Sequence, residues 1–87
     1  MSHIALRILT MTKVVLEARA SSVMIPGSEG DFEVLGNHAP LVTALRPGRI
    51  AATCNGEHKY VQVDGGFVVV MPDRVDVLAD PADVTPR

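Results

Sequence analysis

The stretch Arg49–Gln62, RIAATCNGEHKYVQ, decides the fold. Apolar and polar residues alternate on both sides of the dipeptide Asn55-Gly56, so each side predicts a β-strand with one buried and one solvent-facing side. Asn-Gly between two alternating runs is the strongest short-range signal for a two-residue hairpin, because both residues tolerate a positive φ. We therefore predict an antiparallel hairpin here.

The same two-residue periodicity continues toward both ends of the chain. Alternating apolar runs begin at Ile4, Val14 and Val75. Turn-forming residues separate the runs at Pro26-Gly27, Gly36-Asn37, Arg46-Pro47-Gly48, Asp64-Gly65-Gly66 and Pro72-Asp73. Many short strands at regular spacing are typical of a flattened antiparallel β-sandwich or barrel. The predicted fold class is all-β.

Two segments are apolar almost without interruption. One is Phe67–Met71, and the other is Leu41–Leu45, in which Thr43 is the only polar residue. Each segment is either a strand covered on both faces or a strand whose outer face meets a partner. The sequence leaves both alternatives open, because a chain of 87 residues buries only about 60% of its unfolded surface.

Composition argues against several classes of function. A formal net charge of −2 and three aromatic residues (two Phe and one Tyr) give no basis for nucleic-acid binding. The single cysteine, Cys54, cannot form an internal disulfide, and it has no zinc-ligand spacing with the three histidines. No apolar stretch approaches the roughly 20 residues needed to span a bilayer, so we expect no direct membrane insertion. No cofactor and no metal are predicted.

Glu29, Asp31 and His38 are the residues that could carry chemistry. The two acids flank Gly30 in a predicted turn, either as solvated loop residues or as a surface that faces a cationic partner. His38 lies in a predicted loop, where it would fix the loop by hydrogen bonding or contribute to an interface. A small hydrolase or isomerase would instead need Asp31 and His38 to converge in a pocket.

The alternation stops after Asp80. The order Asp80-Pro81 is that of a helix start, but Pro86 disfavours helix at Thr85, so no helix of useful length fits. We therefore predict one domain over residues 1–80 and a short C-terminal tail over residues 81–87.

Four segments follow one another in a specific order: PGSEGDF (26–32), HAPLVTALRPG (38–48), GGF (65–67) and VDVLAD (75–80). Each is modest alone, but together they resemble the N-terminal domain of the ε subunit of F-type rotary ATP synthases. The resemblance implies a flattened β-sandwich of about ten short strands. It departs from the family at Gly36-Asn37, where Pro-Gly is usual, and at Asp64, where serine is usual.

The resemblance also implies a function. The chain would be a non-catalytic rotor subunit of the central stalk, which couples the γ subunit to the membrane c-ring for proton-driven ATP synthesis and has no small-molecule substrate. It would be peripheral, at the cytoplasmic face of the bacterial inner membrane. By resemblance, the residues facing the c-ring would be Glu29, Asp31 and His38, and those at or near γ would be Leu41, Val42, Thr43 and Leu45.

Most members of that family continue into a C-terminal helical hairpin that can inhibit ATP hydrolysis and in some binds ATP. We expect neither activity by that route from this sequence. Two other interpretations stay open. One is a stand-alone β-sandwich adaptor that binds extended peptides along an edge strand and has no affinity for γ. The other is the ε subunit of a sodium-translocating rotary ATPase, because the coupling ion is chosen in the c-ring.

Overall fold

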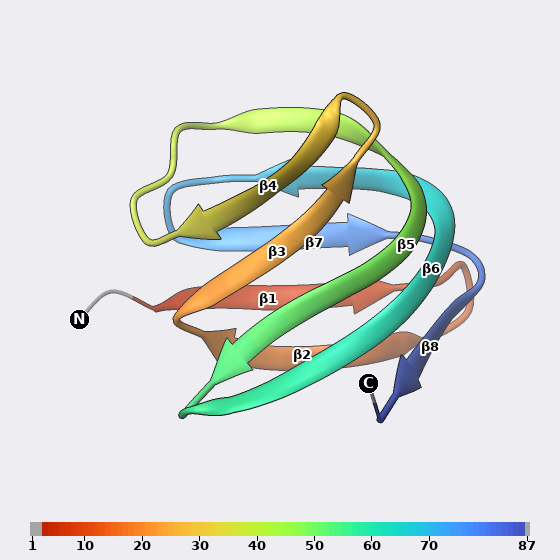
Figure 1. The fold of residues 1–87 in the computed structure, drawn as a ribbon, viewed down its shortest axis with the longest axis horizontal. Coiled ribbons are helices and arrows are strands. Elements are labelled where there is room, and N and C mark those ends of the chain that lie inside the picture. The colour runs from red at the N-terminus through yellow and green to blue at the C-terminus, as the bar shows by residue number, and fades with distance from the viewer. Residues whose placement is uncertain (1–2, 87) are drawn as a thin grey trace.

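The computed structural model describes residues 3–86, which form eight β-strands and no helix. The described part of the chain therefore has no helix that could cross a membrane. Figure 1 shows the strands, which are β1 (Ile4–Leu9), β2 (Val14–Ala20), β3 (Ser22–Gly27), β4 (Gly30–Leu35), β5 (Leu41–Cys54), β6 (Glu57–Val70), β7 (Arg74–Leu78) and β8 (Ala82–Thr85).

The strands form one sheet that folds over on itself. Its order is β2-β1-β7-β6-β5-β3-β4, with β8 added to β6, and only the β1–β7 pair is parallel among these strands. The first layer holds β2, β1, β7 and the adjoining parts of β6 (67–70) and β5 (41–45). The second layer holds β4, β3, β8 and the remaining parts of β5 (50–54) and β6 (57–63). The all-β sandwich prediction is confirmed.

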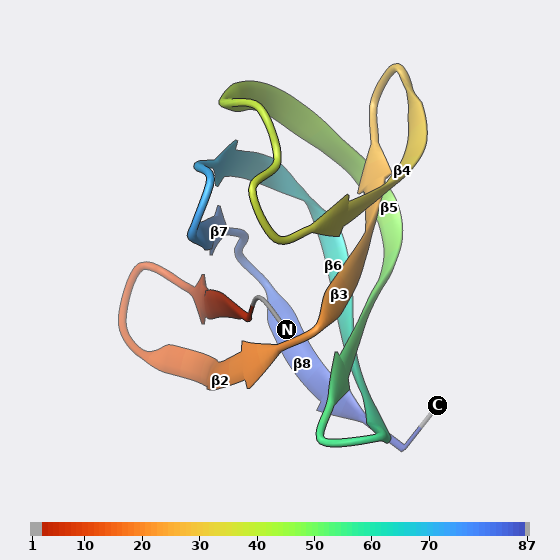
Figure 2. The ribbon, with the colours of Figure 1, turned by 90° about the vertical axis from the view of Figure 1, so that its left-hand side faces the viewer.

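The expected count of about ten strands is wrong, and β5 and β6 explain the difference. Each of these strands has 14 residues and curves through both layers without a break (Figures 1 and 2). Five strand segments in each layer are therefore built from eight strands. Arg46-Pro47-Gly48 and Gly65-Gly66, which the sequence predicts as turns, lie within β5 and β6 where the two strands bend.

The central hairpin forms as predicted. Cys54 pairs with Glu57 across the two-residue turn, and Asn55 and Gly56 have φ values of 53° and 79°. Positive φ at both turn residues is the type I′ geometry that matches the twist of the flanking strands. The turn predicted at Pro26-Gly27 is displaced, since both residues belong to β3.

The core is one cluster of aliphatic side chains between the two layers. Leu6, Val68 and Val77 of the first layer and Val23 and Val34 of the second are fully buried. Among the described residues, no polar or charged side chain is buried. Such a core stabilises the fold by removing apolar surface from water, at about 25 cal/mol per Å².

Cys54 lies in this core. Burial raises the pKa of its thiol, the nearby Glu57 carboxylate adds to that effect, and the Lys59 ammonium opposes it. The thiol is therefore protonated at neutral pH. A protonated, buried thiol is inert, so Cys54 packs as a small apolar side chain.

The prediction of a tail over residues 81–87 is wrong for Ala82–Thr85. This segment forms β8 and pairs with residues 60–63 of β6. The segment has only four residues, and only Ala82 among them is buried. It therefore shows no hydrophobic alternation in the sequence. The Asp80-Pro81 peptide bond before it is cis.

Candidate functional site

The turn between β3 and β4 carries the predicted acidic residues. Ser28 and Glu29 form the turn, and the Ser28 N–H donates a hydrogen bond of 2.9 Å to the Ala44 carbonyl oxygen. Arg46 of β5 forms an ion pair with Asp31 at the start of β4. The turn is thus fastened to β5 at two points, and the Glu29 carboxylate is exposed at its tip.

His38 lies in the loop between β4 and β5 and is half-buried. Its Nδ1 lies 2.7 Å from the Ala39 carbonyl oxygen, and its ring centroid lies 6.5 Å from that of Phe32 on β4. The preceding residue, Asn37, has a φ of 63° and donates its N–H to the Pro72 carbonyl oxygen at 2.8 Å. The Asn37 hydrogen bond fastens the loop to Pro72, whereas the role of His38, in the loop or at an interface, stays a prediction.

The three predicted residues lie in and around β4 without converging on a pocket. Glu29 lies in the turn before β4, Asp31 near the start of the strand, and His38 in the loop after its end. Asp31 is held by Arg46, whereas the described polar contact of the His38 ring is to its own neighbour, Ala39. Within residues 3–86 the structure therefore gives no support for an acid–histidine pair of the kind a hydrolase would need.

A second candidate surface lies on the outer face of the first layer. Val42, Phe67, Val69 and Leu78 are 68%, 60%, 37% and 50% exposed. Strand register makes them neighbours: Val42 pairs with Val69, and Phe67 pairs with Leu78. We call these four residues the apolar band. Leu78 also pairs with the partly exposed Leu9, so the band continues onto β1.

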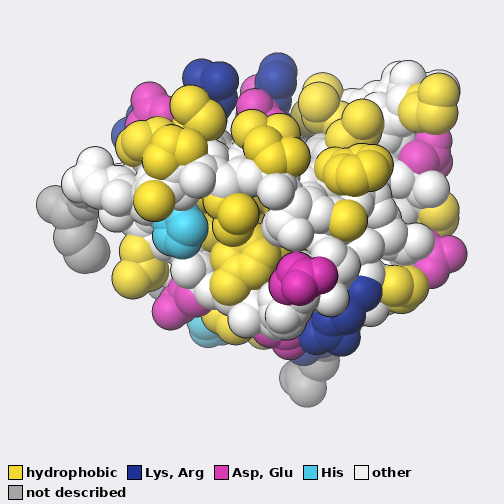
Figure 3. Space-filling model, turned by 90° about the horizontal axis from the view of Figure 1, so that it is seen from above, with side chains coloured by type: hydrophobic (Ala, Val, Ile, Leu, Met, Phe, Trp, Pro, Cys, Tyr) yellow, Lys and Arg dark blue, Asp and Glu magenta, His cyan; other side chains and the backbone are white. Residues whose placement is uncertain are grey.

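Hydrophobic side chains are also prominent at the upper end of the molecule. Figure 3 shows that end from above, with several patches of hydrophobic side chains over the face and charged side chains and histidine between and around them. On a small soluble domain, a contiguous exposed apolar patch such as the apolar band usually marks a site that binds a partner. The outer apolar surface of this sandwich is thus a candidate protein-binding site.

The structure separates the four residues that were predicted to lie near γ. Val42 faces outward, whereas Thr43 is paired with the fully buried Val68 and faces inward. Leu41 faces the same way as Thr43 but is 37% exposed at the end of its strand, and Leu45 is only 6% exposed and belongs to the core. Burial leaves Leu45 no outward surface for a direct contact.

Phe67, Val69 and Leu78 are the members of the band that the sequence did not assign. A signal for Phe67 and Val69 was present, because the run Phe67–Met71 was recognised as having either a covered or a partner-binding outer face. The structure favours the second alternative, since Val68 and Val70 are buried whereas Phe67 and Val69, which alternate with them, are exposed. Leu78 stands at an outward position between Val77 and Ala79, where a polar residue is usual.

Comparison with known proteins identifies the family. The family described as "ATP synthase, Delta/Epsilon chain, beta-sandwich domain" matches residues 3–84. The chain belongs to this family. The resemblance seen in the sequence motifs is confirmed, and we refer to the chain below as a δ/ε-family domain.

Curated relatives of this δ/ε-family domain are named ATP synthase epsilon chain. The one from Dehalococcoides mccartyi (strain BAV1) is 42% identical over 83 residues, which cover 95% of this chain and 59% of that protein. The one from Moorella thermoacetica is 43% identical over 86 residues, which cover 95% of this chain and 63% of that protein. The chain thus spans about 60% of the length of these relatives.

Two solved structures share the fold. A chain of the Euglena gracilis mitochondrial ATP synthase assembly containing OSCP, F1 and the c-ring matches with a TM-score of 0.89 and 24% identity, over 97% of this chain and 54% of that one. A chain of the Tetrahymena thermophila mitochondrial ATP synthase central stalk and c-ring matches with a TM-score of 0.76 and 16% identity, over 91% and 64%. At these identities the likeness concerns the fold.

Proposed function

We propose that this δ/ε-family domain is a non-catalytic rotor element of the central stalk of an F-type ATP synthase, where it joins the γ subunit to the c-ring. The observation that carries the proposal is the apolar band on the outer face of the first layer. A contiguous apolar surface on a small domain is explained by a permanent protein partner. The names of the relatives, which are ATP synthase epsilon chains, support an ATP synthase as the assembly.

In the proposal, each of the two candidate surfaces binds a different partner. The γ subunit covers the apolar band, with Val42 at the contact and Leu41, which is exposed at the end of β5, at its margin; Thr43 faces inward and lies near γ without contacting it. Leu45 supports the strand from the core side.

In the proposal, the c-ring meets the turn between β3 and β4, with Glu29 and Asp31, and the loop between β4 and β5, with His38. Carboxylates at a turn pair with basic loop residues, and a turn fastened to β5 can transmit torque without yielding. The domain would then lie at the cytoplasmic face of the bacterial inner membrane, attached through the c-ring.

Gel filtration with the γ subunit of the same organism tests the proposal. We expect a one-to-one complex at micromolar concentrations, because burying the band together with its surroundings provides an interface of ordinary size. Separate elution would contradict the proposal. Binding to unrelated extended peptides without affinity for γ would favour the adaptor interpretation instead.

The variant Glu29→Lys tests the second surface. We expect about 5- to 10-fold weaker attachment of the γ-bound domain to purified c-rings at low salt, because a carboxylate at a polar rim contributes mainly through charge. The measurement is surface plasmon resonance on immobilised c-rings. Glu33→Lys, an exposed acid on β4, is the matched control and should have little effect. An equal loss in both variants would mean that net charge, and not the turn, determines attachment.

A further inference from the structure

A shallow hollow of about 510 Å³ lies on the outer face of the first layer, beside the apolar band. Its floor includes Ala5 of β1, whose side chain ends at Cβ. Strand register sets Ala5 between two longer side chains, Arg19 of β2 on one side and Arg74 of β7 on the other. The hollow therefore arises from a small residue placed between two arginines.

The walls of the hollow are charged. Three guanidinium groups, those of Arg7, Arg19 and Arg74, face two carboxylates, those of Glu17 and Asp76. The arithmetic, three positive and two negative groups, gives a local charge of +1 on a chain whose formal net charge is −2. The hollow is thus a locally cationic site on an acidic domain.

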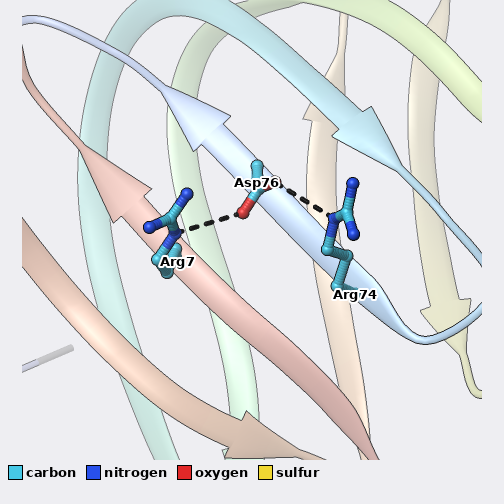
Figure 4. A network of polar contacts seen from close by, with 3 residues as sticks. All are labelled: Arg7, Arg74 and Asp76. Carbon is cyan, nitrogen blue, oxygen red and sulfur yellow. Dashed lines mark hydrogen bonds and ion pairs between the residues drawn. The ribbon is translucent and has the colours of Figure 1, made fainter.

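The ion pairs with Asp76 leave hydrogen-bond donors of Arg7 and Arg74 available for another anion. Figure 4 shows its carboxylate between Arg7 and Arg74, with an N–O distance of 3.4 Å to each. The two arginine side chains are 49% and 55% exposed, and exposed ion pairs at such distances contribute little. Each guanidinium carries five N–H donors, so both arginines can bind a second anion.

Of the three arginines in the hollow, Arg19 has the most guanidinium donors available for a bound anion. Within residues 3–86, no carboxylate oxygen lies within 4 Å of its guanidinium nitrogens. It lies on β2, which is paired only with β1 among the described strands, so its side chain is open to an approaching molecule. A guanidinium fork matches a carboxylate in geometry and binds it through two parallel hydrogen bonds.

The hollow and the apolar band form one continuous surface. Val69 of the band stands directly opposite Asp76, and Asp76 stands directly opposite Arg7. A partner that covers Val69 therefore reaches the edge of the hollow within one strand spacing, about 5 Å.

We propose that the hollow receives a carboxylate side chain of the protein that covers the apolar band. This inference rests on the function proposed above, in which that protein is γ. The contacting segment of γ then presents an apolar stripe next to an aspartate or glutamate. A single carboxylate balances the local charge of +1. A phosphate dianion would carry one negative charge in excess, which Glu17 and Asp76 would repel.

Titration calorimetry with the γ subunit of the same organism tests this inference. We expect Arg19→Gln and Arg74→Gln each to weaken binding about tenfold at low salt, and Arg19→Lys to recover part of the loss. Binding by Arg19→Gln should also depend less on salt than binding by the unchanged domain. Arg49→Gln is the control, because Arg49 lies over the Tyr60 ring at 4.3 Å on the outer face of the second layer.

The outcomes separate this inference from the function on which it rests. If both arginine variants bind γ normally while Leu78→Ser does not, the hollow has no role in docking and the proposed function stands. If the unchanged domain does not bind γ, both proposals are wrong. Micromolar binding of inorganic phosphate to the free domain, abolished by Arg19→Gln, would overturn the inference in favour of a site for a free anion. Circular dichroism of each variant verifies the fold.

Discussion

Replacing Gly66 by alanine is expected to lower the free energy of unfolding by about 3 to 5 kcal/mol. Gly66 has a φ of 126°, which residues with a side chain rarely adopt. An added Cβ would lie 2.3 Å from the Leu78 carbonyl oxygen and 2.9 Å from the Ala79 Cα. Both are backbone atoms at the end of β7, so relief of the clash requires separation of β6 from β7.

Urea unfolding of Gly66→Ala and Gly65→Ala provides a matched comparison. Gly65 has a similar φ of 113°, but its nearest atom to an added Cβ is the Leu45 carbonyl oxygen at 3.8 Å. Gly65→Ala should therefore carry only the backbone strain, about 1 to 3 kcal/mol. Equal losses in the two variants would show that backbone strain, and not the contact with β7, determines the cost.

The size of the domain makes this difference easy to observe. At about 0.05 to 0.15 kcal/mol per residue, an 87-residue chain has roughly 4 to 13 kcal/mol of stability. Gly66→Ala removes a large part of that range. At the lower end of the range the variant would be largely unfolded in the absence of a partner, and binding of γ would restore part of its stability.

Gly66 also illustrates what the sequence could and could not predict. Turn chemistry predicts a reversal of the chain at Asn-Gly and Gly-Gly pairs, and at Asn55-Gly56 that prediction is correct. At Gly65-Gly66 the glycines serve a long strand that bends between two layers and passes close to β7. Local rules contain no information about which strand approaches from elsewhere, so this requirement is visible only in the folded chain.

The candidate surfaces were predictable to different degrees for the same reason. Motif resemblance selected Glu29, Asp31 and His38, and the structure places Asp31 in β4, Glu29 in the turn before it and His38 in the loop after it. The assignment of Leu41–Leu45 to an interface was made for a whole segment, whereas a strand presents only every second residue to one side. Phe67 and Leu78 become neighbours through the pairing of β6 with β7, which the sequence does not specify.

Replacing Leu78 by serine is expected to weaken binding to γ by about 30-fold or more, which corresponds to about 2 kcal/mol. Leu78 stands opposite Phe67 in the apolar band, and the serine would both remove apolar contact area and leave a polar group in the covered surface. The effect is large because residues at the centre of an interface are fully desolvated in the complex, whereas rim residues keep contact with water.

Leu35→Ser is a closely matched control for this prediction. Leu78 and Leu35 are 50% and 52% exposed and both lie at the end of a strand, so the two substitutions remove similar areas of apolar surface from the free domain. Leu35 pairs with Ser22 of β3 in the second layer, away from the band. Calorimetry with γ should therefore give a large loss for Leu78→Ser and a change below about threefold for Leu35→Ser. A similar loss of γ binding in both variants, at equal free energies of unfolding, would contradict this prediction. It would show that γ also covers the second layer and that the apolar band is not what determines γ binding.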